Sequence, residues 1–155
     1  MFKSIVVGTD FSPTAEQAVE HAIGLAKSFG ATLHIVTAFK PAMAANIAAS
    51  SLEAMAAGGA EFIQSAQSAM ADEVEATHNA LVKRMQKEGI RCKTHGMAED
   101  AADAIMEVAE REGCDLIVIG NRGMSSAKRF LLGNVPNKIS HHSPCSVLIV
   151  HTSGD

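Results

Sequence analysis

The chain has 155 residues, of which 47% are hydrophobic and 19% are charged, so we expect a single globular domain over 1–155 and not a disordered chain. The formal net charge of −4 provides no broad cationic surface, which argues against binding to nucleic acid or to an anionic membrane. No apolar stretch has the length and composition of a signal peptide or of a membrane span, and we therefore expect a cytoplasmic protein.

Hydrophobic periodicity divides the chain into alternating strands and helices. Short β-branched runs predict strands, and apolar residues that recur every three to four positions predict helices. Ser12 before Pro13 marks the start of the first helix, and Gly30 marks its end. In chain order, the predicted elements are a strand at 4–7, a helix at 13–29, a strand at 31–39, a helix at 60–87, a strand at 90–96, a helix at 98–112, a strand at 116–119, a helix after Gly133 and a strand at 147–150.

Five strands that alternate with four helical segments predict an α/β fold. We expect a five-stranded, parallel, doubly wound sheet in the order 3-2-1-4-5, with helices on both faces. The strand at 116–119 is apolar without alternation, which is typical of a strand covered on both faces, and 147–150 repeats this pattern. The strand at 90–96 is more polar and suits a sheet edge. Residues 41–58 have the weakest pattern and receive no assignment.

Two loops are expected to face each other across one crevice of this sheet. Ligands of open parallel sheets bind beyond the carboxyl ends of the strands, where the winding reverses. The loops at 8–12 and 120–133 would meet there. The second loop holds three glycines, two serines and three cations but no acid. Glycines allow close approach of the backbone to an anion, and the following helix, with Asn134 as its expected N-cap, adds its positive end, so the loop favours phosphate.

The same glycine spacing is equally consistent with residues that only end a strand and start a helix. However, Gly120-x2-Gly123-x9-Gly133 resembles the nucleotide-binding pattern of the universal stress protein family, and 5–12 and 143–150 resemble that family's first and last strands. Members that carry the glycine pattern typically bind ATP. The resemblance therefore implies an ATP-binding stress-response sensor, which pairs with a second copy as a homodimer through its C-terminal strand.

The resemblance also implies which residues form the nucleotide site. Asp10 and Ile35 would lie on the adenine or ribose side, and Ile119 and Gly120 would border the ribose. Phosphate contacts would come largely from backbone N–H groups, and Asn134 stands where the family has Ser or Thr. The full predicted set is Gly8, Thr9, Asp10, Ile35, Ile119, Gly120, Arg122, Gly123, Gly133, Asn134 and Val135. A narrower similarity of 133–136 and 148–153 to an actinobacterial branch of the family makes cyclic AMP the alternative ligand.

Few residues of the predicted crevice are suited to catalysis. Asp10 is its only carboxylate, and Ser125 and Ser126 are the only hydroxyl residues of the phosphate loop. We therefore expect ligand sensing, with Asp10 helping to hold Mg²⁺ on ATP. Slow ATP hydrolysis or autophosphorylation of a loop serine is one alternative. A ligand-free interaction module is the other.

Other signals for a metal or cofactor are weak in this sequence. Neither a Walker A motif nor a G-x-G-x-x-G fingerprint occurs. The three cysteines have no Cys-x-x-Cys spacing, which argues against a disulfide framework and against a zinc cluster. Side chains of the adjacent His141 and His142 diverge on a helix or strand, so a metal site is not expected there. His34 is expected to be a hydrogen-bonded strand residue.

Overall fold

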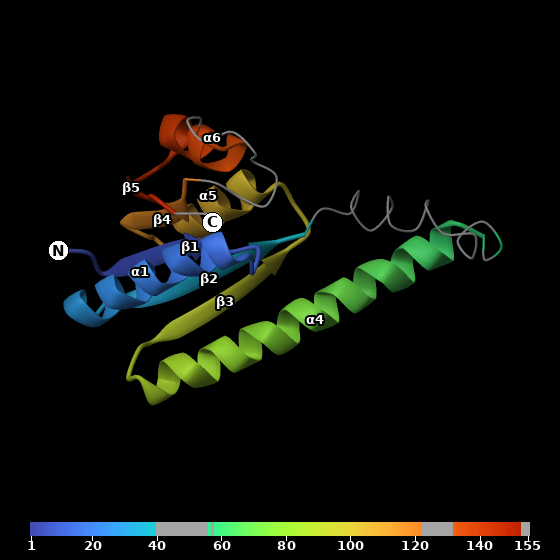
Figure 1. Cartoon of the computed structure of the whole chain (residues 1–155), viewed down its shortest axis with the longest axis horizontal. Helices are drawn as coiled ribbons and strands as arrows, with labels where there is room; N and C mark the ends of the chain where they lie inside the picture. The colour runs from blue at the N-terminus through green and yellow to red at the C-terminus, as the bar shows by residue number, and fades with distance from the viewer. Residues whose placement is uncertain (40–55, 57, 122–131, 153–155) are drawn as a thin grey trace.

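The computed structural model describes residues 1–39, 56, 58–121 and 132–152, and each strand and helix predicted from the sequence is present in it. The strands are β1 (Ser4–Gly8), β2 (Thr32–Ala38), β3 (Cys92–Met97), β4 (Leu116–Gly120) and β5 (Ser146–Val150). The helices are α1 (Pro13–Phe29), α4 (Ala60–Lys87), α5 (Ala101–Arg111) and α6 (Asn134–His142). Figure 1 shows these elements along the chain.

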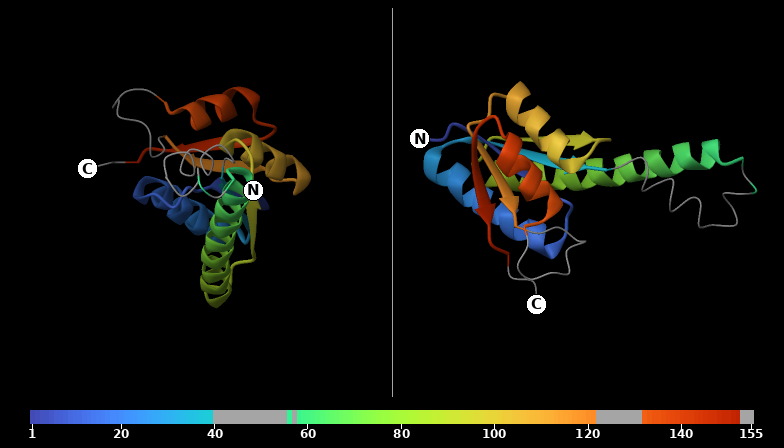
Figure 2. Two further views of the ribbon diagram at one scale, coloured as in Figure 1. Left: turned by 90° about the vertical axis from the view of Figure 1, so that its right-hand side faces the viewer. Right: turned by 90° about the horizontal axis from the view of Figure 1, so that it is seen from above.

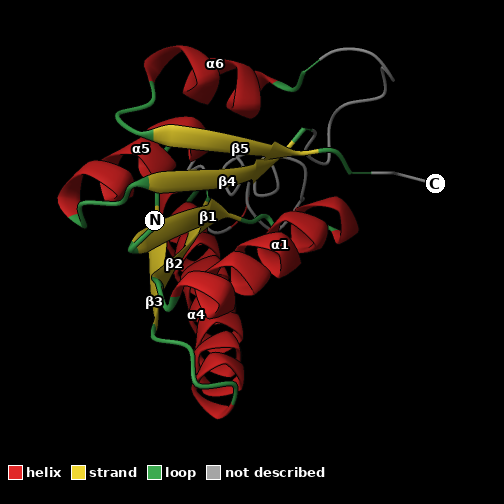
Figure 3. Ribbon diagram, turned by 90° about the vertical axis from the view of Figure 1, so that its left-hand side faces the viewer, coloured by secondary structure: helices red, strands yellow, loops and turns green. Residues whose placement is uncertain are grey.

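The five strands form one parallel sheet in the order β3-β2-β1-β4-β5, which confirms the predicted topology. The central strand β1 pairs with β2 on one side and with β4 on the other. The chain therefore winds first toward β3 and then returns past β1 toward β5 (Figure 3). The carboxyl ends of β1 and β4 lie side by side where the winding reverses.

Helices cover the sheet on both faces, and each face has its own apolar core (Figure 2). Because side chains alternate along a strand, β1 directs Ile5 and Val7 into the core under α1 and α4, and Val6 into the core under α5 and α6. Burial of one such aliphatic side chain stabilises the fold by about 1.5–3 kcal/mol. The central strands are thus fixed from both sides.

The two edge strands differ from the central ones. The strand β3 is partly exposed along its length, as its polar sequence predicts. The strand β5 alternates between exposed and more buried residues, with Leu148 36% exposed. The expectation that 147–150 is covered on both faces is therefore wrong: Val147 and Ile149 pack against the core under α5 and α6, whereas on the opposite face Val150 is buried in the core under α1 and Leu148 is exposed.

Capping at the first helix follows the sequence prediction, whereas capping at α6 does not. Ser12 Oγ accepts a hydrogen bond from the Ala15 N–H (3.2 Å), and Gly30 ends α1 in the left-handed region (φ 64°). The N-cap of α6 is Gly133 and not Asn134, which is the first helical residue. The Gly133 N–H donates to the Asn121 carbonyl (3.0 Å), and this contact holds Gly133 extended.

The helix α4 is 28 residues long, and its amino-terminal turns extend past the sheet (Figures 1 and 2). Its buried side chains, His78 and Met85, lie in its carboxyl-terminal half, where α4 packs against the sheet. Within the described ranges, none of the helices combines the length and the apolar character needed to cross a membrane.

Candidate functional site

The first loop of the predicted crevice follows β1. Hydrogen bonds within the loop and one to β2 fix its backbone. The Thr9 N–H donates to the Val36 carbonyl (2.9 Å), and Thr9 Oγ1 accepts from the Phe11 N–H (3.0 Å). Asp10 Oδ1 accepts from the Ser12 N–H (3.0 Å), and Phe11 has a positive φ of 59°. The loop therefore has a defined shape and presents an exposed carboxylate, that of Asp10, at the carboxyl edge of the sheet.

Gly8, at the end of β1, has a packing role of its own. A Cβ atom at this position would lie 2.3 Å from Ile105 Cδ1 and 3.1 Å from Ile105 Cγ1. Ile105 is buried in the core under α5. The absence of a side chain at Gly8 therefore allows α5 to approach β1, independently of any ligand.

Asn121, which the sequence analysis did not select, joins three segments at this edge. Its backbone N–H donates to the Val150 carbonyl (2.9 Å), and its carbonyl accepts from the Gly133 N–H (3.0 Å). Its side-chain Oδ1 accepts from the backbone N–H of Thr152 (2.9 Å) and from the Thr152 hydroxyl (2.7 Å). Asn121 thereby fixes the start of α6 and the end of β5 against β4. A single asparagine after an apolar strand gives no local signal of this role.

The start of α6 lies at the same edge, and its first backbone donors receive no side-chain cap from any of the described residues. Gly133 supplies no side-chain cap, and the first turn contains no acidic residue. The first N–H groups of a helix lack intrahelical acceptors, and here those of Asn134 and Val135 belong to this set. Pro136, the third helical residue, has no N–H and fits a position where that group would have no partner. A helix end of this kind attracts an anion.

The other predicted site residues divide into two groups. Ile35 is 0% exposed and Ile119 is 3% exposed, so each side chain lies in one of the two apolar cores, Ile35 in the core under α1 and α4 and Ile119 in the core under α5 and α6. Their assignment to the adenine and ribose side stays a prediction. Arg122 and Gly123, like Ser125 and Ser126, lie outside the described residues.

A buried polar pair, also missed in the sequence, lies between the sheet and α4. His78 Nε2 is 2.9 Å from Thr37 Oγ1, and the Phe11 ring packs edge-on against the His78 ring at 6.1 Å between centroids. Burial lowers the pKa of His78, and His95 adds a smaller effect in the same direction. The pair links α4 to β2 and to the loop after β1.

Comparison with known proteins gives consistent matches along nearly the whole chain. A family profile, described as the Universal stress protein family, matches residues 1–151. The universal stress protein Rv1636 of Mycobacterium tuberculosis is 34% identical over 156 residues, which cover 98% of this chain and 98% of the relative. The universal stress protein YxiE of Bacillus subtilis is 32% identical over 151 residues, with coverage of 97% and 99%.

Two solved structures are similar to this fold. A universal stress protein crystallised in complex with cAMP has a TM-score of 0.67 and 29% identity, and the match covers 98% of each chain. The protein MJ0577 has a TM-score of 0.82 and 23% identity, and the match covers 100% of this chain and 99% of the other. At that level of identity, the second match supports the fold alone.

Proposed function

This chain belongs to the universal stress protein family, and on that premise we propose that it binds an adenine nucleotide, ATP in the first instance, at the carboxyl edge of the sheet. The protein then acts as a cytoplasmic stress-response sensor whose state or partners change with occupancy. The observation that carries the proposal is the start of α6, which has no side-chain cap and is fixed beside the end of β4 by the bond from Gly133 to Asn121.

Phosphate binding in this proposal relies on the backbone. The N–H groups of Asn134 and Val135 point out of a helix end that carries a partial positive charge of roughly half a unit. Gly133 allows close approach because it has no side chain. Arg122 and Gly123, from the predicted phosphate loop, add a cation and further backbone access. The whole chain carries a net charge of −4, so phosphate attraction must be local.

The nucleoside side of the proposed site is the loop after β1, with Gly8, Thr9 and Asp10, together with Gly120. The side chains of Ile35 and Ile119 support this surface from within the sheet. The exposed Asp10 carboxylate uses Oδ1 for the Ser12 N–H and has a second oxygen, which fits the Mg²⁺ preference for one or two carboxylates beside phosphate oxygens. Mg²⁺ would offset the repulsion between Asp10 and the phosphates of ATP.

Cyclic AMP is the second candidate ligand, and one observation favours it. The solved universal stress protein that holds cAMP is 29% identical and aligns over 98% of each chain. Cyclic AMP carries one phosphate and needs no metal ion to offset Asp10. Asp10→Asn therefore separates the two ligands: it should weaken binding of Mg-ATP and leave cAMP binding equal or stronger.

The test is thermal unfolding of the protein with Mg-ATP, with cAMP and without ligand. A ligand at 100 times its dissociation constant should stabilise the folded state by about 2.7 kcal/mol. Gly133→Val should abolish the shift because its side chain blocks the helix end. Gly24→Val, the same change at an exposed position of α1 with open space around it, is the matched control.

Each outcome of that test has a definite meaning. A shift with Mg-ATP supports the first ligand, and a shift with cAMP alone supports the second. Steady phosphate release from ATP would favour the hydrolase alternative, and labelled phosphate on Ser125 or Ser126 would favour autophosphorylation. No shift with either nucleotide, once mass spectrometry excludes a nucleotide already bound, would contradict the proposal and favour a ligand-free interaction module.

The proposed sensor is a homodimer that pairs through β5. An edge strand with an exposed apolar side chain such as Leu148 requires cover, and a second copy can supply it. Leu148→Lys should therefore reduce the mass measured by light scattering to that of one chain. Leu132→Lys replaces a similarly exposed leucine outside β5 and should leave the mass unchanged. A single-chain mass for the parent protein would contradict this assignment.

A further inference from the structure

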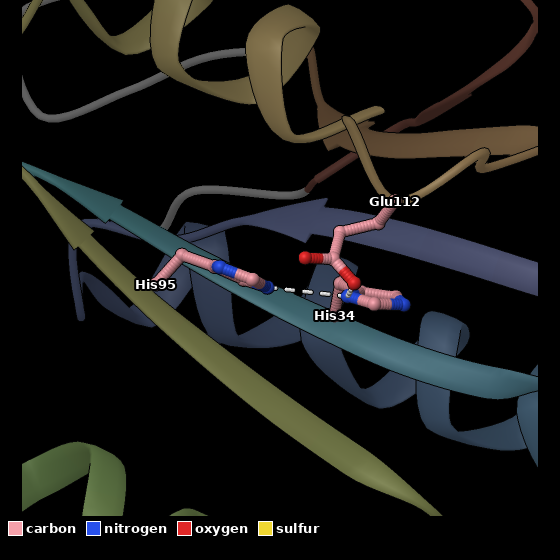
Figure 4. Close-up of side chains that lie close together, drawn as sticks. All are labelled: His34, His95 and Glu112. Carbon is pink, nitrogen blue, oxygen red and sulfur yellow. Dashed lines mark hydrogen bonds and ion pairs between the residues drawn. The ribbon is translucent and has the colours of Figure 1, made fainter. Parts of the chain in front are cut away.

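Three side chains with metal-binding atoms meet on the α5 face of the sheet, away from the carboxyl edge. They are His34 of β2, His95 of β3 and Glu112, which follows α5 (Figure 4). His34 Nδ1 is 3.1 Å from His95 Nε2 and 3.9 Å from Glu112 Oε2. One ligand atom from each of the three residues lies within 4.8 Å of the other two. We call these three residues the His34 cluster.

Strand register and the end of α5 bring the cluster together. His34 aligns with Lys93, and Val36 aligns with His95, so His34 and His95 project from the same face of neighbouring strands. The two rings are stacked, with centroids 5.4 Å apart and an interplanar angle of 20°. Glu112 is the C-cap residue of α5, and its carboxylate extends over the His34 ring (Figure 4).

We propose that the His34 cluster is a binding site for a divalent transition-metal ion of the zinc class. Two imidazole nitrogens and one carboxylate oxygen form a donor set that Zn²⁺ uses, with a fourth position left for water or another ligand. Donor atoms around tetrahedral Zn²⁺ lie about 3.3 Å apart, given bonds of about 2.0–2.1 Å. Two of the three separations, 3.1 and 3.9 Å, are near that value and the third is no longer than 4.8 Å, so modest side-chain movements bring the three atoms to it.

The protonation states of the cluster suit a metal ion. Burial lowers the pKa values of His34 and His95, so both rings are neutral near neutral pH and keep a lone pair. A hydrogen bond from Lys93 lowers the pKa of Glu112, which is therefore ionised. His34 is only 2% exposed, so its ring is held in place before any ion arrives.

Two cations compete with the metal ion for the same ligand atoms. Lys93 Nζ donates to Glu112 Oε2 (2.9 Å), and Arg111 Nη2 donates to His95 Nδ1 (3.2 Å). The contact from Arg111 leaves the ring hydrogen on His95 Nε2, which donates to His34 Nδ1. Binding of a metal ion at His95 Nε2 moves that hydrogen to Nδ1 and displaces Arg111.

Displacement of these cations is inexpensive. The Lys93 side chain is 61% exposed and the Arg111 side chain is 48% exposed. Exposed ion pairs contribute little to stability; Lys93 can turn into solvent, and Arg111 also pairs with Glu107. This competition gives the proposal a distinctive consequence, because removal of Lys93 should strengthen metal binding.

The experiment is a calorimetric titration of the nucleotide-free, full-length protein with Zn²⁺, so its outcome does not depend on the proposed nucleotide function. We expect one ion per chain. His95→Asn and Glu112→Gln should each weaken binding by more than about tenfold, since even outer-shell changes around metal ions cost that much. Lys93→Ala should strengthen binding about two- to fivefold. These variants spare the buried His34 and should keep the fold, which circular dichroism checks.

The control is a double variant, His141→Asn with His142→Asn, which removes two exposed histidines from α6. Its Zn²⁺ affinity should equal that of the parent. The proposal is overturned if the parent binds no Zn²⁺, if His95→Asn binds as the parent does, or if only the His141 and His142 variant loses binding. Zn²⁺ should also raise the unfolding temperature of the parent and not that of folded His95→Asn, because the ion binds the folded state.

Discussion

Two polar regions of this sheet differ in how they are built. The carboxyl edge consists of short runs of neighbouring residues, 8–12, 120–121 and 133–135, and it presents backbone N–H groups and one exposed carboxylate. The His34 cluster consists of single residues from three elements, and it presents side-chain lone pairs. The first region therefore favours an anion and the second a cation.

The two regions are encoded in the sequence in different ways. A site made of backbone donors depends on where strands end and helices begin, and short sequence patterns reveal those positions. A site made of side-chain ligands depends on register between strands. The two histidines are 61 positions apart, and parallel pairing alone brings them together. Substitutions at four positions, Ile35, Gly8, Asn121 and His78, test this contrast.

The largest effect is expected from Ile35, whose side chain is fully buried beneath the edge. Ile35→Ala should lower the free energy of unfolding by about 2–5 kcal/mol, because it leaves a cavity in the core. Denaturation with urea measures the loss. Ile35→Val, which should cost only about 0.5–1.5 kcal/mol, keeps the fold for nucleotide titration.

The nucleotide affinity of Ile35→Val separates a core role from a ligand contact. If the edge is a backbone site that the core only supports, affinity should equal that of the parent. A clear loss of affinity in this folded variant would mean that the Ile35 side chain contacts the nucleoside. The carboxyl edge would then not be a site made of backbone donors from short runs of residues alone.

The fold was predictable because its signals are local and agree with one another. Uninterrupted apolar residues at 116–119 predicted a covered strand, and the Ser12 and Gly30 caps predicted the ends of the first helix; the structure confirms these assignments. The cap of α6 was not predicted correctly, because the contact that holds Gly133 extended comes from Asn121, twelve positions earlier.

The candidate site was predictable only in part. The loop after β1 and the start of α6 follow from turn and helix signals, so the sequence placed Asp10 and Gly133 at this edge; their contacts with a ligand stay predictions. Asn121 was missed because its partner Thr152 is 31 positions away, and His95 was missed because its partners come from other elements. Side-chain partners across the sheet require the register, which hydrophobic patterns determine only approximately.

The second prediction concerns Gly8, which lies in the edge but contacts the core. Gly8→Ala should destabilise the protein by about 1–3 kcal/mol, because the new Cβ would overlap Ile105 Cδ1 at 2.3 Å. Ile105→Val removes that atom, so the double variant should lose less stability than the sum of the two single variants. Urea denaturation of the four proteins measures this coupling.

Gly24→Ala, in open space on α1, is the control for Gly8→Ala and should cost no stability. Strict additivity of the Gly8 and Ile105 changes would remove the packing explanation. The lack of a side chain at Gly8 would then be explained by access for the ligand and not by contact with Ile105.

The third prediction tests the junction at Asn121. Asn121→Ala removes the oxygen that accepts from both the backbone and the hydroxyl of buried Thr152, and it should cost about 1–2 kcal/mol. Amide hydrogen exchange at Thr152 should become faster. Asn121→Asp keeps an acceptor at the same place and should lose less; equal losses for the two variants would contradict the role assigned to Oδ1.

The smallest effect at neutral pH is expected from His78, the buried partner of Thr37. Burial lowers the pKa of His78 in the folded state, so the folded protein resists taking up the proton that the unfolded chain accepts. The stabilising contribution is complete above the unfolded pKa of about 6.5 and is lost as the pH falls through the lower folded pKa. His34 and His95 have lowered pKa values as well and contribute in the same direction.

The contribution of His78 to this pH dependence is obtained by comparing the free energy of unfolding of the parent with that of His78→Gln from about pH 7 to about pH 5. Stability of the parent should decline with acidification, and His78→Gln should decline less steeply, because glutamine can still bond to Thr37 Oγ1 but does not titrate. His21→Gln makes the same change on the exposed face of α1 and serves as the control. Equal slopes for the parent and His78→Gln would mean that protonation of His78 does not oppose folding. In that case the acid sensitivity of the sheet would arise on the α5 face, at His34 and His95.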